Sequence, residues 1–305
     1  MSPPLKPATH LREGCRFFID TPAKVNLSLK ITGIRADGYH TLESLFCGID
    51  LYDSLELRLG GKRLSVSCSD SSIPHDSRNL ALAAAHRFYR DVPAVEGMGL
   101  AIHITKRIPV GAGLGGGSSN AAGVLYALNH IHHQPLPSEQ LSALGLELGA
   151  DVPFFLFGRP AWATGIGETL TAAPQLPGLS LLVVYPGVSI STRTIYQGLN
   201  LGLTKRPKQH RNSPFKANQF SISRDLVNDL EGVTLRRYPA VKEVKNTLSA
   251  LGARGVLMSG SGSAVFGIFA GPWEVMEAEK ALAANRTWRT FAVKLLTEGP
   301  YLRVS

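Results

Sequence analysis

Residues 109–120 read Pro-Val-Gly-Ala-Gly-Leu-Gly-Gly-Gly-Ser-Ser-Asn, a glycine-rich segment that precedes a predicted helix. Five glycines among residues 111–117 let the backbone turn tightly and approach a ligand closely. A helix is expected to follow, from about Ser118 to His132, which places Ser118 and Ser119 at its N-cap. Free backbone N–H groups and the positive end of the helix dipole favour an anion there. The stretch therefore predicts a phosphate-binding loop.

Other interpretations of this loop are weaker. A Walker P-loop requires Gly-Lys-Ser/Thr, whereas residues 117–118 read Gly-Ser, which excludes that motif. A Rossmann fingerprint matches Gly111, Gly113 and Gly116, but no second strand follows in residues 132–137, so the βαβ unit is missing. A turn without a ligand is disfavoured because so many glycines are costly to order.

The rest of the chain alternates between strand-like and helical segments. From the spacing of apolar residues we predict strands at 15–33, 55–59, 64–68, 100–104, 181–185, 256–258, 264–269 and 290–296, and helices at 79–90, 138–149, 239–251 and 273–284. The Pro-Gln-Leu-Pro-Gly segment at 174–178 has the composition of a linker. We therefore expect an α+β protein, with an N-terminal domain at 1–176 and a smaller α/β domain at 177–305.

The composition fits a globular protein with an anionic partner. Hydrophobic residues make up 44% of the 305 residues and charged residues 18%, which excludes a disordered chain. The net charge of +9 suggests a nucleic acid, an acidic membrane surface or a phosphorylated small molecule. Residues 201–224, interpreted as a long loop, hold six basic residues and no acidic ones. Three cysteines without a C-x-x-C pair favour a reduced cytosol, and no apolar run reaches the ~18 residues of a membrane span.

Two further positions carry groups suited to catalysis. Lys24 and Asn26 are two residues apart in the first predicted strand, so both side chains project from the same face. The simpler interpretation is that this face is exposed to solvent and has no catalytic role. Asp151 lies just after the predicted helix at 138–149, where a carboxylate is unfavourable, although a turn-forming aspartate is the alternative. The spacing of these residues does not indicate whether they meet in space.

A series of motifs, in order along the chain, carries a family resemblance. They are Pro22-Ala-Lys-Val-Asn-Leu27, Arg35-Ala-Asp-Gly-Tyr-His-Thr41, Pro109–Ala122, Gly149-Ala-Asp-Val-Pro153 and Met258-Ser-Gly-Ser-Gly-Ser263. With them the chain resembles, from about residue 20 onward, the 4-diphosphocytidyl-2-C-methyl-D-erythritol kinases. That family lies within the galactokinase, homoserine, mevalonate and phosphomevalonate (GHMP) kinase superfamily. The glycine loop alone indicates only the superfamily, whereas the second and fourth motifs are typical of the particular family.

The resemblance implies a fold and a reaction. The fold would be the two-domain GHMP kinase fold, with an N-terminal ribosomal-protein-S5-like domain, a C-terminal ferredoxin-like domain and the active site in the cleft between them. The reaction would transfer the γ-phosphate of ATP to the 2-hydroxyl of 4-diphosphocytidyl-2-C-methyl-D-erythritol, a step of the non-mevalonate isoprenoid pathway. Mg²⁺ would accompany ATP. The partners would be these small molecules, with no nucleic acid or membrane, and the enzyme would be cytoplasmic.

The resemblance also implies residue roles. Lys24 and Asp151 would be the catalytic pair. Asn26, Tyr39, His40 and Tyr196 would bind the substrate, with Tyr196 against the cytosine ring. The ATP loop would comprise Pro109, Val110, Gly111, Ala112, Gly113, Leu114, Gly115, Gly116, Gly117, Ser118 and Ser119, supported by the glycine motif of Gly260, Ser261 and Gly262. Either Ser118 or Ser119 would lie near the metal.

Several alternatives stay open on the sequence. Another GHMP kinase, acting on a smaller alcohol, would not need Tyr39, His40 and Tyr196 for a nucleobase. A basic nucleic-acid-binding protein would need aromatic residues interleaved with its basic residues, and residues 201–224 offer few. The carboxylate ligand of the metal is not fixed, since Glu168 could equally be a surface residue. A monomer and a homodimer remain equally possible.

Overall fold

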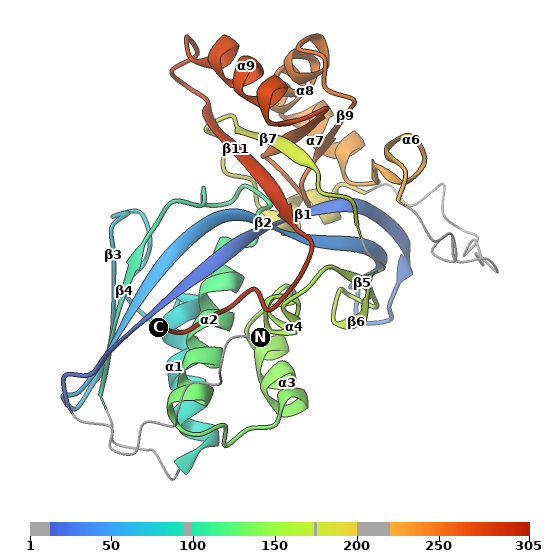
Figure 1. The fold of residues 1–305 in the computed structure, drawn as a ribbon. Coiled ribbons are helices and arrows are strands. Elements are labelled where there is room, and N and C mark those ends of the chain that lie inside the picture. Colours follow the sequence, from blue (N-terminus) through green and yellow to red (C-terminus); the bar gives the residue numbers. More distant parts are fainter. Residues whose placement is uncertain (1–12, 94–98, 174–175, 200–219) are drawn as a thin grey trace.

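The computed structural model describes residues 13–93, 99–173, 176–199 and 220–305, and these form two layered units along a curved pair of long strands (Figure 1). The elements up to residue 172 are β1 (Arg16–Ile34), β2 (His40–Leu59), β3 (Leu64–Cys68), α1 (Leu80–Asp91), β4 (Leu100–Thr105), α2 (Gly116–Ile131), α3 (Ser138–Leu148), α4 (Val152–Phe157), β5 (Ala161–Thr164) and β6 (Thr169–Ala172). Those that follow are β7 (Ser180–Tyr185), α5 (Thr192–Gln197), α6 (Ile222–Asp225), β8 (Val227–Asn228), α7 (Glu231–Arg237), α8 (Pro239–Ala250), β9 (Gly255–Met258), β10 (Val265–Phe269), α9 (Pro272–Leu282) and β11 (Arg289–Leu296).

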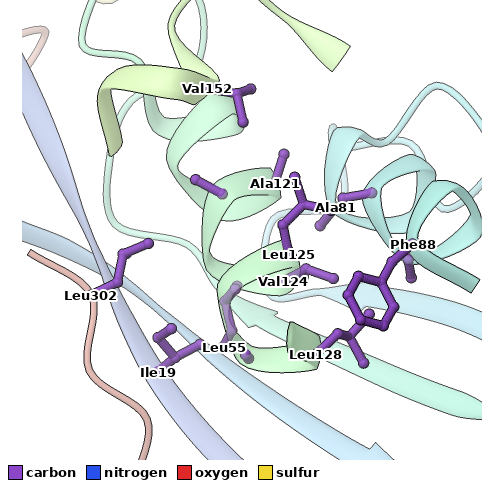
Figure 2. Close-up of a cluster of buried hydrophobic side chains, with 14 of the residues drawn as sticks. Ile19, Leu55, Ala81, Phe88, Ala121, Val124, Leu125, Leu128, Val152 and Leu302 are labelled. Carbon is purple, nitrogen blue, oxygen red and sulfur yellow. The ribbon is translucent and has the colours of Figure 1, made fainter. Parts of the chain in front are cut away.

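The first unit packs α1, α2 and α3 on one face of the sheet formed by β1 to β4 (Figure 1). Helix α2 is central, because its apolar side chains contact both α1 and the long strands (Figure 2). Val124, Leu125 and Leu128 of this helix are fully buried. Burial of each such leucine contributes about 1.5–3 kcal/mol. The glycine loop is thus attached to a helix that cannot shift without disturbing the core.

The start of α2 differs from the prediction. The N-cap is Gly115, in the left-handed conformation with φ of 73°, rather than Ser118 or Ser119. The Ser119 N–H already donates to the Gly115 carbonyl at 2.9 Å, so both serines lie inside the first turn. The prediction was wrong because serine is the commoner cap, whereas here a glycine provides the positive φ that the turn requires.

The second unit is the predicted ferredoxin-like domain. Its antiparallel strands are ordered β11-β7-β10-β9, which is the β-α-β-β-α-β arrangement with helices between β7 and β9 and between β10 and β11. Helices α8 and α9 cover the sheet (Figure 1). Val241, Val244 and Leu248 of α8 are fully buried against it, which follows from their i, i+3, i+7 spacing.

The two units are joined at several places besides the chain connection. Strand β11 pairs with β2 through Leu295 and Leu296, and β8 pairs with β1. The chain beyond β11 returns to the first unit, where Leu302 is buried beside Ile19 in its core (Figure 2). The boundary at 176/177 stays a prediction, and both units contribute strands to this shared framework.

The polar face of β1 is buried, contrary to the solvated-face alternative. Lys24, Asn26 and Ser28 are 4%, 1% and 1% exposed. Alternation of polar and apolar residues correctly identifies the two faces of a strand, but it does not show what covers the polar one. Here two glycines pack against it: a Cβ placed at Gly115 would lie 3.0 Å from Lys24 Cγ, and one placed at Gly260 would lie 3.5 Å from Asn26 Oδ1.

The basic stretch at 201–224 falls mostly outside the described residues. The loop interpretation is wrong for its described end, where the short helix α6 begins at Ile222, and for residues 201–219 it lies outside the described residues. Residues 1–12 and part of the predicted linker, residues 174–175, likewise lie outside the described residues. Among the described helices, none is long and apolar enough to span a bilayer.

Candidate active site

A cavity of about 880 Å³ lies where β1, the glycine loop, the start of α4 and α5 come together. Its wall includes nearly all of the predicted site residues. They are Lys24, Asn26, Tyr39, His40, residues 109–118, Asp151, Tyr196, Gly260 and Ser261. Ser119 and Gly262 are not part of this wall, although each is adjacent to residues that are. One cavity therefore collects side chains from positions more than 230 residues apart in sequence.

Lys24 and Asp151 meet in this cavity. The Lys24 ammonium lies 3.5 Å from Asp151 Oδ2, and the two side chains are 5% and 32% exposed. Asp151 precedes α4 and makes no capping hydrogen bond to that helix, so its carboxylate is free to face the cavity. The backbone of Asp151 does lie in a turn before α4, as in the turn-forming alternative, and its catalytic role stays a prediction. The pair joins a buried cation to an accessible carboxylate, which is an arrangement suited to moving a proton.

Three hydrogen bonds in series fix the position of the Lys24 side chain. Its ammonium donates to Asn26 Oδ1 at 2.8 Å, and Asn26 Nδ2 donates to Ser44 Oγ at 2.8 Å. The Ser44 hydroxyl in turn donates to the Ser28 carbonyl at 2.6 Å. Because Asn26 uses both ends of its amide within the protein, it orients Lys24. Its predicted direct contact with a substrate stays a prediction.

The glycine loop packs directly on the third glycine motif. Ser259 Oγ donates to the Gly113 carbonyl at 2.9 Å, and the Ala264 N–H donates to the Ala112 carbonyl at 3.0 Å. Gly113 has a φ of +75°, and a Cβ placed there would lie 2.1 Å from the Ser259 carbonyl oxygen. Only glycine allows this approach. The third motif therefore contacts the glycine loop directly, and the predicted supporting role of Gly260, Ser261 and Gly262 in ATP binding stays a prediction.

We expect Gly113→Ala to deform the loop and weaken ATP binding. A left-handed φ costs an alanine about 1–2 kcal/mol, and the methyl group would also displace the Ser259 backbone. The KM for ATP should rise at least about tenfold and the melting temperature should fall. Thermal unfolding and ATP titration measure both. Gly178→Ala is the matched control, because its Cβ would meet nothing within 4 Å. An unchanged KM for Gly113→Ala would show that the loop's shape does not control binding.

The first turn of α2 separates the two serines. Ser118 lines the cavity, and its Oγ lies beside Gly149, two residues before Asp151. Ser119 is 0% exposed, and its hydroxyl has no hydrogen-bond partner among the described residues. The first N–H groups of a helix have no intrahelical acceptor, so those of Gly116, Gly117 and Ser118 can bind an anion. Of the two serines, Ser118 is the one that a ligand can reach.

Part of the cavity wall is aromatic. The rings of His40 and Tyr196 lie 5.2 Å apart at 46°, while Tyr39 stands at the rim, 63% exposed. Burial lowers the pKa of His40, so its ring is neutral at neutral pH. Burial, and then the nearby charge of Asp151, raise the pKa of Tyr196, which keeps its hydroxyl protonated. A neutral, partly apolar slot of this kind suits a flat uncharged ring.

One polar pair at the cavity was missed in the sequence. The Lys106 ammonium lies 2.7 Å from Asp53 Oδ2, with side chains only 6% and 0% exposed, and it also donates to the Ile108 carbonyl. Asp53 Oδ1 accepts the N–H groups of Arg107 and Ile108 at 2.7 and 2.9 Å. The pair fixes the chain entering the glycine loop. An aspartate inside the apolar alternation of β2 was the available signal.

Comparisons with known proteins agree with this geometry. The family model for the GHMP kinases N terminal domain matches residues 79–159, and the model for GHMP kinases C terminal matches residues 208–288. The chain is 42% identical over 276 residues to the 4-diphosphocytidyl-2-C-methyl-D-erythritol kinase of Syntrophus aciditrophicus (strain SB), covering 90% of this chain and 97% of that protein.

Solved structures show the same relationship. A crystal structure of 4-(cytidine 5'-diphospho)-2C-methyl-D-erythritol kinase superposes with a TM-score of 0.76 at 40% identity, covering 92% of this chain and 100% of that one. Homoserine kinase from Cytophaga hutchinsonii superposes with a TM-score of 0.66 at 19% identity, covering 97% and 99%, and shares the fold alone. The predicted two-domain GHMP kinase fold is confirmed. The chain belongs to the 4-diphosphocytidyl-2-C-methyl-D-erythritol kinases of the GHMP kinase family, which are ATP-dependent phosphotransferases.

Proposed function

We propose that this chain phosphorylates the 2-hydroxyl of 4-diphosphocytidyl-2-C-methyl-D-erythritol, with ATP as the donor. The observation that carries the proposal is the single cavity that joins the glycine loop, the Lys24–Asp151 pair and the His40–Tyr196 rings. These three features match the three parts of the reaction, namely the triphosphate, the reacting hydroxyl and the nucleobase. A substrate without a base would leave the aromatic end of the cavity unused.

Asp151 is assigned the role of general base. As the hydroxyl oxygen bonds to the γ-phosphorus, the carboxylate accepts the hydroxyl proton and ADP leaves. Lys24, 3.5 Å from that carboxylate, orients it and offsets negative charge on the transferring group. Phosphoryl transfer depends on such positioning and charge stabilisation more than on covalent chemistry by the protein. The buried chain through Asn26 and Ser44 keeps the ammonium in place.

The glycine loop is assigned to the phosphates of ATP. Its N–H groups at Gly116, Gly117 and Ser118 carry no charge, so their contribution is fixed dipoles at short range. These N–H groups can therefore bind a polyanion without help from the net positive charge of the chain. The basic stretch at 201–224, which holds most of that charge, is not part of this assignment.

The oxygen donors near the loop fit Mg²⁺. Mg²⁺ in kinases is held by one or two protein oxygens together with substrate phosphates and waters. Ser118 Oγ, at the start of α2, is an oxygen donor in the cavity wall, and no cluster of three or more metal-binding side chains occurs among the described residues. The ion would neutralise the β- and γ-phosphate oxygens. Glu168 does not line the cavity, and its carboxylate accepts the Ile166 N–H at 2.6 Å within its own turn.

We expect Tyr196→Ala to raise the KM for the cytidyl substrate by at least about tenfold, since stacking on an aromatic ring contributes about 1–3 kcal/mol per base. The KM for ATP should stay within twofold. Tyr196→Phe is the matched control, because it keeps the ring and should bind nearly as well as wild type. Steady-state kinetics with each substrate varied in turn provides the measurement. An unchanged KM for the alanine variant would remove Tyr196 from the base site.

The proposal as a whole is tested by a coupled assay for ADP. ADP should form rapidly when both ATP and the diphosphocytidyl substrate are present, and only at a background rate when the latter is omitted. Equal rates with and without that substrate would contradict the proposal. Turnover with a smaller alcohol instead would favour the alternative GHMP kinase.

A further inference from the structure

Arg193 stands out among the basic side chains of the cavity wall. Of the lysines and arginines that line it, Lys24 pairs with Asp151, Arg78 with Asp76 at 2.7 Å and Lys106 with Asp53. Arg193, by contrast, forms no ion pair or hydrogen bond with any residue that the structure describes. In the sequence, residues 200–219 contain no aspartate or glutamate.

The backbone at Arg193 is nevertheless held firmly. Thr192 Oγ1 and Ser261 Oγ are hydrogen bonded at 2.9 Å, which ties the start of α5 to the third glycine motif. Arg237 donates to the Thr194 carbonyl at 3.1 Å, and Ile195 is fully buried. Arg193 is therefore an exposed cation, unpaired among the described residues, whose backbone is held in place. It lines the cavity proposed for phosphorylated ligands.

The position of Arg193 indicates which phosphates it meets. It precedes Tyr196 by three residues on α5, and residues at that spacing lie on the same side of a helix. Both residues line the cavity, so Arg193 belongs to the same part of its wall as the ring assigned to cytosine. In the substrate, the diphosphate is the charged group attached to the cytidine. A guanidinium matches phosphate oxygens with two parallel hydrogen bonds, which makes arginine more selective than lysine for this task.

We propose that Arg193 binds the diphosphate of the cytidyl substrate and thereby helps to select nucleoside diphosphate esters over uncharged cytidine derivatives. The assignment rests on the proposed function of the cavity. The charge of Arg193 is satisfied by the ligand rather than by the protein, so its contribution appears only when a phosphorylated ligand is bound.

The test uses Arg193→Gln and Arg193→Lys in the full-length enzyme. CDP and cytidine are the binding probes, followed by calorimetry, because they differ only in the diphosphate. Arg193→Gln should weaken CDP binding and raise the KM for the diphosphocytidyl substrate by about tenfold. Cytidine binding and the KM for ATP should stay within twofold. For Arg193→Lys, the CDP affinity and the KM for the diphosphocytidyl substrate should lie between those of wild type and Arg193→Gln, within about threefold of wild type. Arg236→Gln, an exposed arginine of α7 outside this cavity, is the matched control and should change nothing.

Several outcomes would overturn the assignment. Equal loss of CDP and cytidine binding would show a structural effect on the base site. A rise in the KM for ATP alone would place Arg193 at the triphosphate. Unchanged values throughout would make it a solvated surface residue. If the wild-type enzyme itself failed to phosphorylate the cytidyl substrate, the proposed function would fail instead, and the two failures are therefore distinguishable.

Discussion

Asp151→Asn is expected to lower kcat by at least about 100-fold, because a positioned base contributes about 10²–10⁴-fold to proton transfer. The asparagine keeps the size of the side chain but cannot take the hydroxyl proton. The KM for ATP should change less than threefold, since the loop N–H groups that bind phosphate remain. Because the Asp151 side chain is 32% exposed, the melting temperature should change little. Steady-state kinetics and thermal unfolding together provide the measurement.

The control for this variant is Glu274→Gln, which removes an exposed carboxylate on α9, remote from the cavity. It should behave as wild type. A kcat for Asp151→Asn within threefold of wild type would exclude Asp151 as the base. A large rise in the KM for ATP with unchanged kcat would show that Asp151 serves the nucleotide and not the hydroxyl.

Lys24→Met should have an effect of similar size, with kcat reduced by about 10²–10³-fold. The methionine preserves volume in a site where Lys24 is 4% exposed, so the loss reports the missing ammonium. It leaves the Asp151 carboxylate without its cation and Asn26 Oδ1 without its donor. Single-turnover kinetics separates this chemical defect from substrate binding. Lys280→Met, an exposed lysine of α9, is the control and should have wild-type kcat.

A double variant tests whether the pair acts as a unit. If Lys24 works through Asp151, combining Lys24→Met with Asp151→Asn should cost little more than the worse single change, as is usual for groups that cooperate in one step. Losses that multiply would show that the two residues act independently. In that case the 3.5 Å contact would be incidental to the chemistry.

The parts of the site that the sequence predicted are local. The glycine loop, the helix after it and the strand at β1 follow from backbone freedom and from the period of apolar residues, which act over a few positions. The individual roles of Lys24, Asp151 and Tyr196 came instead from the family resemblance. Their placement in one cavity agrees with those roles, which remain to be measured.

The features of the fold and site that the sequence did not predict depend on contacts between segments far apart in the chain. The buried polar face of β1, the return of Leu302 into the first core and the pairing of β8 with β1 all arise from packing across long separations. Periodicity identifies a face but does not identify its neighbour. The Lys106–Asp53 pair illustrates the same limit, because each residue alone is an ordinary charged side chain near a strand end or within an alternating strand.

The most direct test of the account is the identity of the product, read by phosphorus NMR after incubation of the enzyme with ATP and a panel of acceptors. We predict a new phosphomonoester on the 2-hydroxyl of 4-diphosphocytidyl-2-C-methyl-D-erythritol, with its diphosphate intact, and no new signal with homoserine or mevalonate. A phosphate added to another oxygen of the substrate would contradict the placement of Asp151 as the base. Turnover of homoserine or mevalonate without turnover of the cytidyl substrate would contradict the account as a whole.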